Sequence, residues 1–169
     1  NGKPSKGDIV LVLKADKALG QEGYRISIGD VTTVSAATVK GLKWGTRTVL
    51  QMAEQNKSNG GTLPKGNIVD SPEYGLRGFM MDCGRKFIPM DYLRSLVKTM
   101  AYYKMNTLQI HLNDNGFRQF FDGDWDKTQA AFRLECDTYP GLTARDGSYT
   151  KKEFIDLQKL AEQYGVNII

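Results

Sequence analysis

Two segments in the second half of the sequence carry the polar side chains best suited to chemistry. LRGFMMDCGRKF at positions 76–87 contains Arg77 and Asp82, and YYKMNTLQIHLNDNGFR at positions 102–118 contains His111, Asp114 and Asn115. His111 is the only histidine in the chain. Charged and hydrogen-bonding groups are costly to place at the end of a buried strand, so they usually serve a function there. These residues are therefore the first candidates for a site.

The elements around these residues alternate between strand and helix. The pattern predicts a strand over 76–82, a helix from Pro89 to about residue 104, and a strand over 106–112. Thr150 and Glu153 form a capping-box pattern that opens a second helix, and Gly165 fits its end. A third strand is expected over 166–169. Parallel strands joined by helices indicate the beginning of a (β/α)₈ barrel.

Three strands are fewer than the eight of a complete barrel. We therefore expect the chain to be a fragment of a longer protein, with a truncated (β/α)₈ barrel over residues 73–169. The edge strand of such a sheet lacks a partner, so self-association through this open edge is a further expectation. The alternative is a complete small α/β protein with three parallel strands.

The first part of the chain, residues 1–72, reads as a small α/β domain. Gly29-Asp30 separates two short apolar runs and predicts a β-hairpin. Ser35 is expected to cap a helix that reaches Gln55, in which Gly41 and Gly45 suggest close approach to a sheet. The predicted strands cover 8–13, 24–28, 31–34 and 67–72, and the apolar face of the helix comprises Val39, Leu42, Thr46, Val49, Leu50 and Ala53.

Composition excludes several classes of protein. The 169 residues include no apolar run of about 18 residues, so no membrane span is expected. The net charge of +4 comes without a tight basic cluster and does not favour nucleic acid as a partner. Cys83 and Cys136 are too few for a disulfide framework or a metal site, and two unpaired, partly buried thiols are expected.

Both polar segments resemble the opening of the catalytic barrel of family 20 glycoside hydrolases, the β-N-acetylhexosaminidases. HLNDN, from His111 to Asn115, resembles the His-Leu-x-Asp-Asp loop of that family, and Arg77-Gly78 resembles its Arg-Gly motif. The first part is similar to the domain that precedes the barrel, through EGYRISI, VSAATVKGLKWGTRTVLQM and the strand ending at Asp70. The resemblance therefore covers nearly the whole chain.

The resemblance implies roles for individual residues. Arg77 would hydrogen-bond sugar hydroxyls in the −1 subsite. Asp114 would hold a later histidine that contacts the acid catalyst, and His111 matches the histidine of the same loop. Arg77, His111 and Asp114 are expected to converge on one rim of the interrupted barrel. The sequence departs from the family pattern at three positions, which puts subsite preference in doubt: Asn115 for Asp, Gln109 for His, and Lys86 for His.

Further candidates for the rim of the site are Asp82, Asn115, Arg133 and Glu135. Arg133 and Glu135 lie in the long segment after the second strand, where barrel loops surround the active site. They could contact sugar or form a surface ion pair with each other. Trp125 and Tyr139 could stack on sugar rings, although packing within the loop is the favoured reading.

The activity implied by the resemblance is hydrolysis of terminal, non-reducing N-acetyl-β-D-hexosamine residues from glycans. The mechanism is retaining and substrate-assisted, and it needs an adjacent Asp–Glu pair but no metal or other cofactor. The sequence contains no such dipeptide, so the chain alone is expected to be inactive. The alternative is a non-catalytic carbohydrate-binding or scaffolding module. Family usage favours an extracytoplasmic location, either secreted, periplasmic or on the cell surface.

Overall fold

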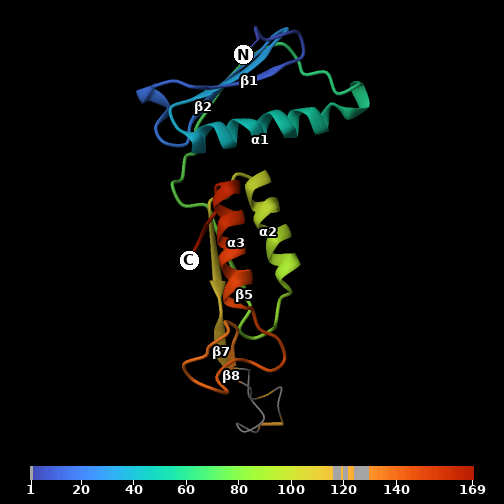
Figure 1. The fold of residues 1–169 in the computed structure, drawn as a ribbon. Coiled ribbons are helices and arrows are strands. Elements are labelled where there is room, and N and C mark those ends of the chain that lie inside the picture. The colour runs from blue at the N-terminus through green and yellow to red at the C-terminus, as the bar shows by residue number, and fades with distance from the viewer. Residues whose placement is uncertain (1, 116–118, 120–121, 124–129) are drawn as a thin grey trace. The chain divides into compact units, whose positions relative to one another are not determined.

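The computed structural model describes residues 2–115, 119, 122–123 and 130–169 (Figure 1). The chain divides into two compact units. The first comprises residues 1–75 and 101–104, and the second comprises residues 76–100 and 105–169. The expected division after residue 72 did not anticipate that residues 101–104 group with the first unit. The two units are described separately.

The first unit contains a four-stranded mixed sheet in the order β1-β3-β2-β4. Strand β2 (Tyr24–Ile28) pairs antiparallel with β3 (Thr32–Ala36) and with β4 (Gly66–Asp70), as expected of a hairpin followed by a returning strand. Strand β1 (Ile9–Leu13) pairs parallel with β3. Short 3₁₀ turns, η1 (Lys17–Leu19) and η2 (Lys57–Asn59), complete the unit.

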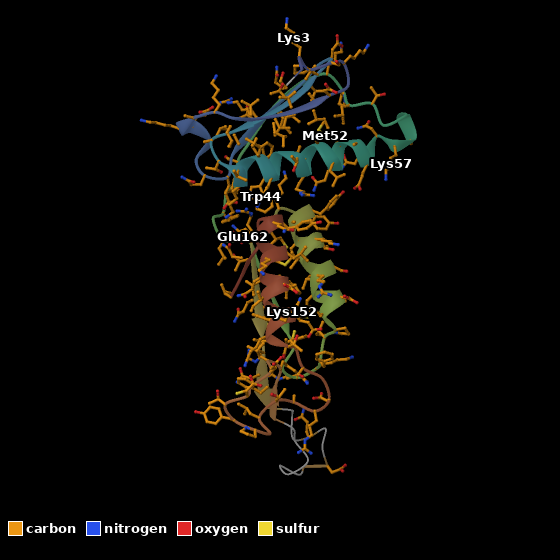
Figure 2. All side chains as sticks on the ribbon, viewed as in Figure 1. Lys3, Trp44, Met52, Lys57, Lys152 and Glu162 are labelled. Atoms are coloured by element: carbon orange, nitrogen blue, oxygen red, sulfur yellow. The ribbon has the colours of Figure 1, made fainter. Side chains whose placement is uncertain are left out.

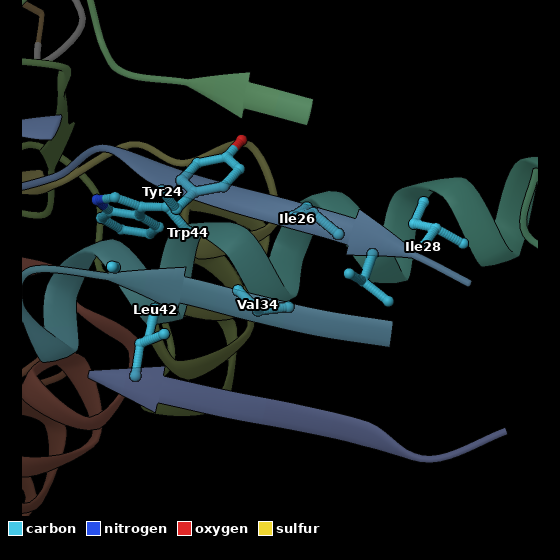
Figure 3. Close-up of a cluster of buried hydrophobic side chains, with 8 residues drawn as sticks. Tyr24, Ile26, Ile28, Val34, Leu42 and Trp44 are labelled. Carbon is cyan, nitrogen blue, oxygen red and sulfur yellow. The ribbon is translucent and has the colours of Figure 1, made fainter. Parts of the chain in front are cut away.

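Helix α1 (Val39–Gln55) packs on this sheet, and the pair encloses the core of the unit. Figure 3 shows that core, formed by Tyr24, Ile26, Ile28, Val34, Ala36, Leu42, Trp44 and Val49. The helix approaches the sheet closely at Gly45, where an added Cβ would lie 2.4 Å from Val34 Cγ1. The expected close approach at the helix glycines is therefore correct.

Two details of α1 differ from expectation. Thr38 rather than Ser35 caps the helix, because β3 continues to Ala36 and Ser35 remains in the strand. The buried face is also rotated: Val39 is 56% exposed, whereas Trp44 is 1% exposed and donates from Nε1 to Glu22. Trp44, marked in Figure 2, was not among the expected core residues of this helix.

The second unit contains a three-stranded parallel sheet in the order β5-β6-β9. The strands are β5 (Gly78–Asp82), β6 (Thr107–His111) and β9 (Asn167–Ile168), and helices α2 (Met90–Tyr102) and α3 (Lys151–Tyr164) connect them. Figure 1 shows both helices on one face of the sheet. This architecture confirms the predicted alternation of strand and helix.

The pleat of β6 separates the two faces of this sheet. Leu108 and Ile110 are buried, whereas Gln109 between them is exposed. Because parallel neighbours in register face the same way, Met80 and Asp82 of β5 share the face of Gln109 and His111. Within the described residues, no helix has the length and apolar character needed to cross a bilayer.

Helix α3 has the ends that its sequence predicts. The Thr150 hydroxyl accepts from the Glu153 backbone, and the Glu153 carboxylate accepts from the Thr150 backbone. Gly165 closes the helix with a left-handed φ of 80°. A short antiparallel ribbon of β7 (Asn113–Asn115) and β8 (Ala130–Phe132), which the sequence did not reveal, follows β6.

Candidate functional site

The carboxyl ends of β5 and β6 bring two predicted site residues together. Asp82 is the last residue of β5 and pairs in register with His111, the last residue of β6. Both side chains lie on the face of the sheet opposite to the buried Leu108 and Ile110. In parallel α/β structures, this edge is where loops and strand ends form binding sites.

Asp114 completes a network of charged side chains at this edge. Its Oδ2 atom lies 2.7 Å from His111 Nε2 and 2.8 Å from Arg85 Nη2. Arg85 also binds Asp82, with 2.7 Å between Nη1 and Oδ2. One guanidinium thus bridges two carboxylates, one of which also binds the imidazole. An ionised Asp114 would accept this hydrogen bond from the His111 tautomer that carries its proton on Nε2.

The ion pair between Asp82 and Arg85 is held in its charged form. Burial raises the pKa of Asp82, but hydrogen bonds from the backbone and guanidinium of Arg85 outweigh that effect and leave the pKa below its ordinary value. The hydrogen bond to Asp82 raises the pKa of Arg85. The four side chains are between 24% and 38% exposed, so solvent and a ligand can reach them.

Gly84 explains how the chain brings these groups together. Its backbone N–H donates to His111 O at 2.9 Å, and the N–H of Cys83 donates to the same oxygen at 3.0 Å. An added Cβ on Gly84 would lie 2.8 Å from the backbone nitrogen of Asp114. The loop after β5 therefore lies directly against the segment after β6, and only glycine fits at this contact.

The backbone of Arg77 lies at the start of β5, and its convergence with His111 and Asp114 stays a prediction. Arg77 precedes β5 instead of lying within a strand, and its backbone pairs with Asn106, which precedes β6. At about 3.3 Å per strand residue, five residues separate it from Asp82 by roughly 16 Å. The structure thus places the backbone of Arg77 at the amino edge of the sheet.

Arg85 is the functional candidate that the sequence reasoning missed. It was not among the predicted site residues, yet its guanidinium contacts both Asp82 and Asp114. A signal was available, because Asp82 and Arg85 are three residues apart directly after a strand, where a side chain can bind the following backbone. The Arg85 N–H does donate to Asp82 Oδ1 at 3.0 Å.

Arg133 is buried and does not lie on an exposed rim. It is 1% exposed, and each of its guanidinium nitrogens donates to a neighbouring group. Its carboxylate partner is Asp146, at 2.6 Å, so the surface pair with Glu135, one of the two readings open from the sequence, is wrong. That hydrogen bond, the largest influence, lowers the pKa of Asp146.

Glu135 acts at the start of α3. Its Oε2 accepts from the backbone N–H of Lys151 at 2.9 Å, where a carboxylate complements the positive end of the helix. Tyr139 is 66% exposed. Asn115 belongs to β7, but its side chain and the whole of Trp125 lie outside the described residues.

The arrangement can bind hydroxyl groups and orient protons. Two carboxylates and an imidazole accept or donate hydrogen bonds, and a guanidinium supplies donors with fixed planar geometry. Among the residues that the structure describes, no three His, Cys, Asp or Glu side chains are grouped to hold a metal ion. Cys83 and Cys136 are both free, in agreement with expectation, and Cys83 is buried.

Comparison with known proteins gives consistent matches over both units. The model of the glycosyl hydrolase family 20 catalytic domain matches residues 74–169, and that of domain 2 of the same family matches residues 1–71. A β-hexosaminidase from Akkermansia muciniphila is 36% identical over 153 residues, which cover 89% of this chain and 31% of that protein. A β-hexosaminidase from Vibrio furnissii is 28% identical, over 96% of this chain and 28% of that protein.

A solved structure shows the same fold. The family 20 β-N-acetylhexosaminidase from Streptomyces coelicolor A3(2) superposes with a TM-score of 0.77 at 26% identity, over 98% of this chain and 34% of that one. The chain therefore spans about a third of the length of these proteins or less. The fold class is α/β, with the second unit corresponding to part of a (β/α)₈ barrel domain.

Proposed function

The chain belongs to glycosyl hydrolase family 20, and from this membership we propose that the whole protein is a β-N-acetylhexosaminidase. Its substrates are then glycans with terminal, non-reducing N-acetyl-β-D-glucosamine or N-acetyl-β-D-galactosamine. Support comes from the relatives named above, which are β-hexosaminidases, and from the charged network at the carboxyl edge of the β5-β6-β9 sheet.

The proposed reaction is retaining and substrate-assisted. The acetamido oxygen of the substrate attacks the anomeric carbon, while an adjacent Asp–Glu pair orients the acetamido group and protonates the leaving oxygen. These 169 residues contain no such dipeptide. The chain by itself should therefore not hydrolyse a chromogenic N-acetyl-β-glucosaminide, whereas the complete gene product should. Turnover by the isolated chain would contradict this account of the chemistry.

Within the site, Arg85 is a second candidate beside Arg77 for the sugar-binding arginine, and we propose Arg85. Arg85 carries the fork of donors that suits paired hydroxyls, and it lies beside the two carboxylates and His111 at an accessible edge. Asp114 and His111 keep their proposed supporting role, in which a carboxylate fixes the tautomer and orientation of an imidazole. This assignment rests on one observation: the Oδ2 atom of Asp114 contacts both Arg85 and His111.

Two matched arginine variants test the assignment. Because His111 is the only histidine, its ring protons give an isolated NMR signal that can be followed during titration with N-acetylglucosamine. We expect saturable shifts for the wild type and for Arg77→Gln, and their loss for Arg85→Gln. Loss of binding in Arg77→Gln alone would restore the original assignment, and no response in the wild type would remove the sugar site from this part of the protein.

We propose two further properties. The outer edge of β5 has no strand partner among the described residues, so the chain should self-associate through the sheet at high concentration. Light scattering coupled to gel filtration measures this directly. An extracytoplasmic location follows only from family usage, and cell fractionation tests it.

A further inference from the structure

Arg133 is a buried cation that the proposed reaction does not use. Its Nε atom donates to Cys83 O at 2.7 Å, and its Nη2 atom donates to Gly84 O at 3.0 Å. Cys83 and Gly84 are buried, so without Arg133 these carbonyls would lose their partner away from water. The guanidinium therefore fixes the turn that immediately precedes Arg85.

The same turn fixes the segment that carries the other site residues. The N–H groups of Cys83 and Gly84 both donate to His111 O, and the Cα of Gly84 faces the backbone of Asp114. Arg133 also acts through its own backbone, because its N–H donates to Leu112 O at 2.9 Å, one residue after His111. Displacement of the turn would therefore alter the distance between Arg85 and Asp114.

The far side of Arg133 is anchored to the segment before α3. Its Nη1 atom donates to Asp146 Oδ1 at 2.6 Å and to Gly147 O at 2.9 Å. The ring of Phe87 lies 5.7 Å from the guanidinium carbon, and an added Cβ on Gly147 would overlap that ring. The Arg133 guanidinium is thus bonded both to the turn after β5 and to the segment before α3, so it can hold the turn in a fixed position.

We propose that Arg133 is a positioning residue for the Arg85–Asp114–His111 network. It fixes the loop after β5 against the segment after β6, so that the guanidinium of Arg85 meets Asp114 while Asp114 meets His111. The substrate of that network rests on the proposed function, but the geometry does not. A test that uses no sugar therefore separates a failure of this inference from a failure of the proposed function.

The test follows the NMR signals of the His111 ring in the 169-residue chain. Asp114→Asn provides the reference, because it directly weakens the contact between Asp114 Oδ2 and His111 Nε2. Arg133→Lys keeps the positive charge but cannot bridge the two carbonyls and Asp146 at once. We expect Arg133→Lys to move the His111 signals in the same direction as Asp114→Asn.

Leu157→Val is the control for a general loss of stability. Leu157 is fully buried in α3 and contributes no group to the network, so its truncation should lower the melting temperature without moving the His111 signals. Wild-type signals in Arg133→Lys, or equal displacement in Leu157→Val, overturn the inference. If Arg133→Lys does not fold, Asp146→Asn decides: a smaller displacement in the same direction supports positioning, and unchanged signals overturn it.

Discussion

Gly84 allows a test of how the site is assembled, because a single added carbon atom, the Cβ of alanine, would disturb its contact with the segment after β6. In Gly84→Ala, the new Cβ would lie 2.8 Å from Asp114 N and 2.9 Å from Asn113 C. Both are backbone atoms, so neither can rotate away. Either the turn after β5 or the start of β7 must move, and each movement separates Arg85 from Asp114.

The size of the effect follows from the contact distances. Insertion of a methyl group into a close-packed contact costs about 1–3 kcal/mol. For a chain of this length, each kcal/mol lowers the melting temperature by about 2–4 °C. The expected fall for Gly84→Ala is therefore roughly 2–12 °C.

Gly78→Ala is the matched control at the other end of β5. Its added Cβ would lie 3.4 Å from Thr107 O, an ordinary contact, and the unfolded chain would lose conformational freedom. Its stability should change by about 1 kcal/mol or less. Thermal unfolding by circular dichroism measures both variants, and the His111 NMR signals report the site directly.

The contact argument fails if Gly84→Ala melts with the wild type and keeps its His111 signals. It also fails if Gly78→Ala loses as much stability as Gly84→Ala, because the loss could then not be attributed to the close contact between Gly84 and Asp114.

Three other perturbations have defined outcomes. The hydrogen bond from Arg133 lowers the pKa of Asp146, so the ionised carboxylate stabilises the fold at pH values above its unfolded pKa near 3.8. This contribution is lost as the pH falls through the lower pKa of the folded state. Asp146→Asn should therefore flatten the acid side of a plot of melting temperature against pH. Thr150→Ala removes the cap of α3 and should cost about 0.5–2 kcal/mol in chemical denaturation. Cys83 is buried, which raises its pKa, whereas Cys136 is half-buried. A thiol reagent should therefore label Cys136 rapidly and Cys83 only on unfolding. Cys136→Ser should abolish the rapid phase of labelling.

Local signals in the sequence predicted elements well where the deciding contacts lie within a few residues. Tyr24–Ile28 alternates apolar and polar residues and forms β2 over the expected range. Thr150 and Glu153 bind each other across one helical turn and form the expected capping box. Ser35 failed as a cap because its pairing in β3, a tertiary contact, outweighed its local preference.

The site was predicted only in part, because its geometry depends on strand ends that are distant in sequence. Asp82 and His111 end parallel strands that pair in register, Asp114 contacts His111, and Arg85 joins Asp82 to Asp114. Strand β5 begins at Gly78 and not at Leu76, so the backbone of Arg77 precedes the strand. The burial of Arg133 depends on carbonyls fifty residues away in the sequence, which no local pattern reveals.

The β7–β8 ribbon has a consequence for how sequences of this kind can diverge. Strand β7 (Asn113–Asn115) pairs antiparallel with β8 (Ala130–Phe132), so the two ends of the segment between them are held next to each other. Residues can be gained or lost there without displacing Asp114, since each doubling of such an excursion costs only about 0.6 kcal/mol. Length differences between relatives should therefore accumulate between positions 116 and 129.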